Sequence, residues 1–105
     1  MVRIKYKTKP VFKRGDVLEV KEGRTVVVHK EIKKPTGWEY SPYELEQGDT
    51  ILLLGTDRGD KYFKEFLPGT ELERCSFIIQ GIISPWESKY MPYNFKKIGR
   101  SKCKR

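Results

Sequence analysis

Residues 12–18 read Phe-Lys-Arg-Gly-Asp-Val-Leu, and residues 45–51 repeat the pattern as Leu-Glu-Gln-Gly-Asp-Thr-Ile. Each copy has an apolar residue, two polar residues, Gly-Asp, and then a β-branched residue that opens an apolar run. Glycine readily adopts a positive φ, and an aspartate carboxylate accepts hydrogen bonds from nearby backbone amides. The pattern therefore predicts the same turn into a β-strand at two places. A looser third copy occupies residues 66–72, but the unequal spacing indicates recurring turn chemistry and not a repeat protein.

Short runs of β-branched and aromatic residues surround these turns. They predict strands over residues 3–7, 16–21, 24–32, 50–54, 61–67 and 77–83. Glu22-Gly23 and residues 57–60 have the composition of hairpin turns. The fold expected is mainly β, a small barrel or sandwich of five to six short strands. Its predicted core consists of Val17, Val27, Ile51, Leu53, Phe77 and Ile79.

Two Ser-Pro boxes punctuate the strand pattern. Residues 41–44 read Ser-Pro-Tyr-Glu, and residues 84–87 read Ser-Pro-Trp-Glu. Serine caps helices well, proline suits the first helical position, and a glutamate three residues after the cap reaches back to it. The boxes predict two short helical turns, over residues 42–47 and 85–90.

The Gly-Asp turns and the expected one-turn helix resemble those of SH3-like small barrels, including the KOW type of ribosomal and elongation-factor proteins. The resemblance covers residues 10–83 and rests on Gly15-Asp16-Val17 together with Gly23. The glycine that a KOW segment has a few residues later is replaced here by Thr25-Val26-Val27. The resemblance implies a fold and not a function.

Basic residues are concentrated at the two ends of the chain. Residues 1–15 contain six and residues 94–105 contain six, with no acid in either segment, so the body between them is mildly acidic although the whole chain carries +8. The sequence thus predicts one domain over residues 1–105. It would comprise a basic arm over 1–15 that is partly a strand, a β-barrel body over 16–83, and a helical turn with a basic tail over 84–105.

Two basic arms on an acidic body favour contact with a polyanion. We expect a non-enzymatic, cytoplasmic protein that binds DNA or RNA. Lysine and arginine would contact phosphates, and two tyrosines beside the basic tail would stack on bases. The residues in question are Lys5, Lys7, Lys9, Lys13, Arg14, Lys96, Lys97, Arg100, Tyr90 and Tyr93. Trp38 and Trp86 lie outside the expected strands and have two interpretations. They would either stack on bases or close the ends of the barrel.

Other classes of function have little support in the sequence. The single histidine, His29, lies in an expected strand, and no glycine-rich phosphate loop or serine nucleophile motif is present. We expect no metal, no cofactor and no membrane partner. Cys75 and Cys103 lack the spacing of a metal or redox pair. The alternative is a protein-interaction module or small regulator, of the kind that phages encode, which binds an acidic or nucleic-acid-processing protein.

Overall fold

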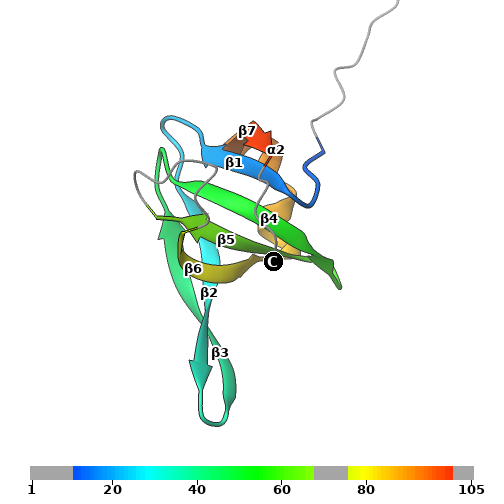
Figure 1. The fold of residues 1–105 in the computed structure, drawn as a ribbon. Coiled ribbons are helices and arrows are strands. Elements are labelled where there is room, and N and C mark those ends of the chain that lie inside the picture. The colour runs from blue at the N-terminus through cyan, green and yellow to red at the C-terminus, as the bar shows by residue number, and fades with distance from the viewer. Residues whose placement is uncertain (1–10, 68–75, 101–105) are drawn as a thin grey trace, which may run out of the picture.

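The computed structural model describes residues 11–67 and 76–100, which form one antiparallel sheet of seven strands and two short helices (Figure 1). The order across the sheet is β3-β2-β6-β5-β4-β1-β7. The elements are β1 (Asp16–Val20), β2 (Val26–Lys34), β3 (Gly37–Leu45), β4 (Thr50–Asp57), β5 (Asp60–Phe66), β6 (Phe77–Ile83), α1 (Pro85–Ser88), α2 (Met91–Asn94) and β7 (Phe95–Arg100). The mainly β prediction is confirmed, although β3 and β7 do not pair and the barrel is not closed within the described residues. The strand expected over residues 3–7, with Lys5, Lys7 and Lys9, lies outside the described residues, as do Cys75 and Cys103.

The two Gly-Asp turns are the same structure and bracket the antiparallel pair of β1 and β4. Gly15 and Gly48 have φ of 90° and 88°. The N–H of Gly15 donates to the Leu53 carbonyl at 2.8 Å, and the N–H of Gly48 donates to the Val20 carbonyl at 3.1 Å. Each turn thus docks on the strand that the other turn opens. This mutual arrangement fixes the register of β1 on β4, in which Leu18 faces Ile51.

One face of the curved sheet encloses the main core. Leu18, Ile51 and Phe63 are fully buried there, and Met91 and Phe95 from α2 and β7 complete the cluster. Val17, Ile51 and Leu53 are buried as predicted, while Phe77 and Ile79 are half-buried and pack at the margins of the two clusters. The prediction for Val27 is wrong, because it is 42% exposed while its neighbour Val28 is buried. The sequence Val26-Val27-Val28 contains no polar residue to mark which side chains face outward.

Gly81 lets β2 join the sheet. β2 pairs with β6 only at His29–Ile82 and Lys30–Gly81. A Cβ on Gly81 would lie 2.3 Å from the backbone oxygen of His29 and 3.0 Å from the ring of Phe63. Only glycine permits this approach, because the backbone it would strike cannot move aside.

The helical turn predicted over residues 42–47 is wrong. Residues 42–45 belong to β3, which pairs with β2 from Val26–Leu45 to Lys34–Gly37, and residues 46–47 lie in the second Gly-Asp turn. Tyr43 and Leu45 point into the interior while Pro42 and Glu44 are exposed, and this alternation is that of a strand. Pro42 is tolerated because β3 lies at the end of the sheet in the described structure.

The helical turn predicted at the second Ser-Pro box, residues 84–87, is present as α1. Ser84 caps α1, and its Oγ accepts a hydrogen bond from the N–H of Glu87 at 3.3 Å. The hairpin turn at residues 57–60 is also confirmed, because Asp57 pairs with Asp60 across Arg58 and Gly59, both with positive φ. Glu22-Gly23 does not form a hairpin, since β1 pairs with β4 and β7 and not with β2. The N–H of Gly23 instead donates to the Gln47 side chain at 2.9 Å, which anchors this connection to the second Gly-Asp turn.

A buried carboxyl links two strands that are not neighbours in the sheet. The hydroxyl of Tyr43 on β3 donates to Oε1 of Glu65 on β5 at 2.7 Å. Burial raises the pKa of Glu65, although the hydrogen bond from Tyr43 opposes that effect. The same hydrogen bond raises the pKa of Tyr43 to about 12. The contact shows that the sheet curls until β3 faces β5 across the interior.

A matched pair of valines tests the register of β2. Val28→Ala should lower the free energy of unfolding by about 1.5–3 kcal/mol, because it removes a fully buried side chain. Val27→Ala should change it by less than about 0.5 kcal/mol, as expected of an exposed residue. Urea denaturation measures both, and equal losses would contradict the assignment of faces.

Glu65 should make stability depend on pH. Because its pKa is raised in the folded protein, folded Glu65 holds its proton to higher pH than the unfolded chain does, where the ordinary value is 4.5. Its contribution to the free energy of unfolding is therefore largest below pH 4.5 and falls as pH rises through the raised pKa. Glu65→Gln should remove this fall. The free energy of unfolding of the variant, relative to that of the wild type, should therefore increase toward neutral pH. Glu44→Gln, at an exposed carboxyl, is the control and should leave the pH profile unchanged.

Candidate nucleic-acid interface

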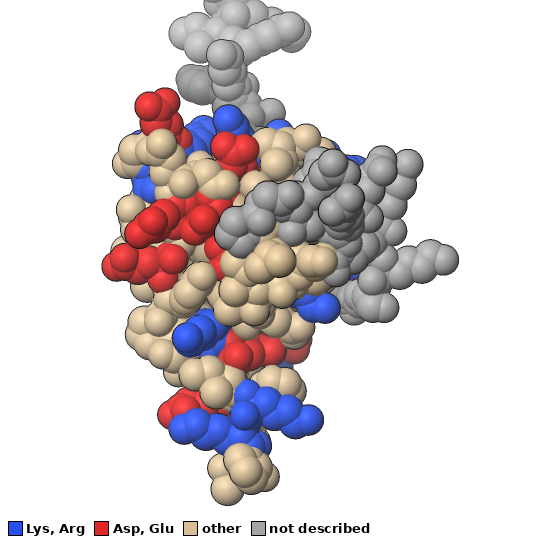
Figure 2. Space-filling view, turned by 60° about the vertical axis from the view of Figure 1, so that its left-hand side comes forward, with Lys and Arg blue, Asp and Glu red and all other residues tan. Residues whose placement is uncertain are grey.

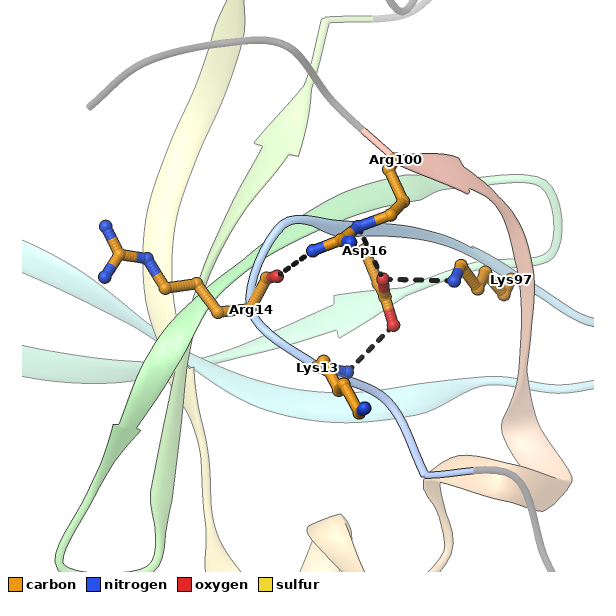
Figure 3. A network of polar contacts seen from close by, with 5 residues as sticks. All are labelled: Lys13, Arg14, Asp16, Lys97 and Arg100. Carbon is orange, nitrogen blue, oxygen red and sulfur yellow. Dashed lines mark hydrogen bonds and ion pairs between the residues drawn. The ribbon is translucent and has the colours of Figure 1, made fainter.

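Asp16, the aspartate of the first Gly-Asp turn, organises a cluster of basic side chains (Figure 3). Its Oδ2 accepts a hydrogen bond from the backbone N–H of Lys13 at 2.8 Å. Its Oδ1 lies 3.3 Å from Nζ of Lys97 and 3.5 Å from Nε of Arg100, both on β7. The Asp16 side chain is 3% exposed, whereas those of Lys97 and Arg100 are 48% and 66% exposed. The acid is thus covered, and the cations over it still face solvent.

Arg100 also ties the two ends of the chain together. Its Nη2 donates to the backbone carbonyl of Arg14 at 3.2 Å, while its Nε contacts Asp16. Figure 3 shows the Arg14 side chain pointing away from this network, and no hydrogen bond of that side chain is drawn. We call Lys13, Arg14, Lys97 and Arg100 the cationic cluster. Lys97 and Arg100 place their charges against the one buried acid, whereas Lys13 and Arg14 join the network through backbone groups, so the cluster as a whole keeps a positive excess.

The cluster depends on β7, which was not foreseen. Residues 95–100 were expected to belong to a basic tail, but they pair with β1 from Val20–Phe95 to Asp16–Arg100. Only Phe95 is buried, and Lys96, Lys97 and Ile98 are exposed, so the segment lacks the apolar alternation that marks a strand in sequence. The pairing brings basic residues from the two ends of the chain to one edge of the sheet.

The remaining predicted residues lie elsewhere. Lys96 pairs with Glu19 of β1 at 3.7 Å. Tyr90 and Tyr93 are exposed, as stacking requires, but they precede Phe95 and so lie at the end of β7 opposite to Arg100. Five residues of strand correspond to roughly 16 Å. Tyr90 packs edge-on against Trp86, with ring centroids 5.8 Å apart. These tyrosines therefore do not form one site with the cationic cluster.

The energetics of the cluster depend on burial. Ion pairs between exposed groups stabilise a protein little, but a buried carboxylate without a partner is costly. Lys97 and Arg100 thus have two roles, since they neutralise Asp16 and present charge outward. The sequence marked Asp16 as a turn former, and this role is confirmed, but nothing in the sequence indicated that cations of β7 would cover it.

The chemistry of such a cluster is anion binding. Arginine presents a planar set of N–H donors that matches phosphate oxygens, and lysine adds a mobile point charge. Within residues 11–67 and 76–100, no group of three or more His, Cys, Asp or Glu side chains is arranged to hold a metal ion. In the same part of the chain, no helix is long and apolar enough to cross a membrane.

Comparison of the chain with protein-family models, curated proteins and solved structures gives no significant match. We therefore infer function from the chemistry of the site.

The two Gly-Asp turns offer a matched test of the role of Asp16. Asp49 accepts the backbone N–H of Glu46 at 2.8 Å in the same way as Asp16 accepts that of Lys13, but no ion pair is formed at Asp49 in the described structure. Asp16→Asn should lower the free energy of unfolding by about 1–2 kcal/mol, because it removes a buried charge-assisted contact to two cations. Asp49→Asn should not lower it by more than about 0.5 kcal/mol, because no cation is paired with Asp49 in the described structure and its charge acts unfavourably on the neighbouring Glu65 carboxylate. Similar losses at both positions would show that Lys97 and Arg100 do not stabilise Asp16.

Proposed function

We propose that this protein binds nucleic acid without catalysing a reaction, and that the cationic cluster contacts the phosphate backbone. The observation that carries the proposal is that Lys97 and Arg100 lie over one buried acid at the β1–β7 edge, beside the turn that carries Lys13 and Arg14. In the sequence, further basic residues precede Lys13 and follow Arg100. Residues held on paired strands lose less conformational freedom on binding than residues of a loose tail.

The proposed contacts are with phosphates and not with base edges. α1 and α2 have four residues each, so neither is long enough to read a groove as a recognition helix does. Sequence preference should therefore be low. The proposal applies to DNA and to RNA, because both present the same phosphate chemistry.

The second candidate function is binding of an acidic protein partner. The observation in its favour is that β3 and β7 lie at the two ends of the sheet and have one neighbour each in the described structure. An open strand edge accepts an added strand from a partner. The cationic cluster lies on the β7 edge and would then select an acidic segment.

A matched pair of arginines at opposite ends of β1 tests the proposal. Arg14 belongs to the cationic cluster, whereas Arg24 follows the far end of β1 and is also exposed. Four engaged cations should give binding a log–log salt slope of about −3. Arg14→Glu should weaken binding at low salt and make the slope shallower by about 1, whereas Arg24→Glu should change neither much. Fluorescence anisotropy with labelled DNA or RNA over a range of salt concentrations measures both effects.

The outcome separates the two candidate functions. Equal effects of Arg14→Glu and Arg24→Glu would show that only net charge matters and would contradict a specific phosphate site. Binding that disappears at physiological salt, together with tight binding to an acidic peptide, would favour the protein partner. Lys97→Glu is unsuitable as a first test, because it would place a second negative charge beside buried Asp16.

A further inference from the structure

The face of the sheet opposite the main core is hollowed along the β4–β5 hairpin and the neighbouring β6. The hollow has a volume of about 430 Å³ and is lined by Leu54, Gly55, Thr56, Asp57, Tyr62, Lys64 and Gln80. We call it the outer groove. It lies beside the β4–β5 hairpin, and the β2–β3 hairpin projects from the body of the protein at another angle (Figure 1).

The end of the β2–β3 hairpin is a two-stranded ribbon. Along the described sheet, β2 pairs with β6 only as far as Lys30, so residues 31–40 have no third strand beside them. Lys33 faces Trp38 directly across the ribbon, and Trp38 is 61% exposed. Figure 2 shows Lys and Arg gathered near the tip of this projection. The interpretation of Trp38 as a residue that closes the end of the barrel is therefore wrong.

The aromatic residues of the ribbon face the same side as the outer groove. Residues that lie opposite each other in an antiparallel pair point to the same face, and alternate residues point to opposite faces. Val28 and Tyr43 point into the core, so Glu31 with Tyr40, and Lys33 with Trp38, point outward. Trp38, Tyr40 and the groove thus belong to one continuous surface.

Hydrogen bonds connect the ribbon to the groove. Nε2 of Gln80 donates to Oε2 of Glu31 at 3.2 Å, and the hydroxyl of Tyr40 donates to Oε1 of Glu31 at 3.5 Å. Glu31 therefore accepts hydrogen bonds from two donors, and Asp57 is a second acid of this surface. Desolvation and the neighbouring Glu31 raise the pKa of Tyr40, and Tyr62 and Asp60 add to the effect.

The other end of the groove adjoins the first Gly-Asp turn. The N–H of Gly15, next to Arg14, donates to the carbonyl of Leu53, and the following residue Leu54 lines the groove. On this outward face Lys33 and Lys64 are accompanied by the acids Glu31 and Asp57. The surface thus runs from the first Gly-Asp turn, next to Arg14, through the groove to Trp38.

We infer that this outer surface binds single-stranded nucleic acid, with bases stacked on Tyr62, Tyr40 and Trp38 and phosphates on Lys64 and Lys33. The inference rests on the proposed function and names its substrate. Aromatic faces interleaved with lysines suit unpaired bases, because every base has a face that can stack, whereas the bases of a duplex are already stacked and paired. Lys64 is held for this role with its Nζ 5.1 Å from the ring centre of Phe77.

The two tryptophans provide a direct optical test. In a Trp86→Phe background, Trp38 is the only tryptophan of the chain. Titration with oligothymidylate should quench its fluorescence, because a stacked base lies against the indole ring. Inorganic polyphosphate, which supplies the charge without bases, should bind the same cations and quench Trp38 much less, because it has no ring to stack on the indole. Equal quenching by both would contradict stacking.

Affinity measurements with a matched variant complete the test. Trp38→Ala should weaken oligothymidylate binding about tenfold and change duplex binding less than about twofold. Trp86→Ala removes a tryptophan of similar exposure from α1, outside this surface, and should change neither. Thermal unfolding of both variants should match the wild type, since both side chains are exposed.

The results distinguish failure of this inference from failure of the proposed function. One outcome is that Arg14→Glu weakens binding, while Trp38→Ala does not and the fluorescence of Trp38 is not quenched. In that case the cationic cluster binds nucleic acid, and the inference that the outer surface binds a single strand is wrong. If no nucleic acid binds at low salt, both are wrong. Loss of single-strand binding in Trp38→Ala with retained duplex binding supports both.

Discussion

The mutual docking of the two Gly-Asp turns is the constraint on which the rest of the structure depends. Gly15 and Gly48 each donate a backbone hydrogen bond to the strand that the other turn opens, and this fixes β1 against β4. Both glycines have positive φ, which other residues adopt at a cost. With β1 and β4 in register, β5 and β6 follow on one side and β7 follows on the other. The cationic cluster and the outer groove are built at the two sides of the first of these turns.

Two buried acids specify contacts that apolar packing leaves open. Asp16 attracts Lys97 and Arg100 and so holds the edge strand β7, whose own sequence has little apolar pattern. Glu65 accepts the hydroxyl of Tyr43 and so sets how far the sheet curls. A buried charge is costly without its partner, so each acid penalises arrangements in which the partner is elsewhere. At Asp16 the same requirement leaves half-exposed cations at the surface, and these are the groups proposed to bind phosphate.

In the proposed function, two parts of one surface contribute different interactions to binding. The cationic cluster would supply long-range attraction, which depends strongly on salt and little on sequence. The aromatic residues of the groove and ribbon would supply short-range stacking, which requires unpaired bases. Leu53 of β4 accepts the N–H of Gly15, next to Arg14, and Leu54 lines the groove. A bound strand would therefore pass from one part to the other along the sheet.

The sequence by itself determined the local structure, and the tertiary structure decided which segments meet. The Gly-Asp turns, five of the seven strands and the Ser84 cap were predicted, because φ preferences, β-branching and capping are properties of neighbouring residues. The corresponding Ser-Pro box at Ser41 forms a strand, because Tyr43 and Leu45 face the interior at alternating positions. Lys97 and Arg100 were predicted as binding residues, but their junction with Lys13 and Arg14 depends on a pairing between β1 and β7 across some 80 residues. The groove and the outward orientation of Trp38 likewise depend on long-range register, which no local pattern encodes.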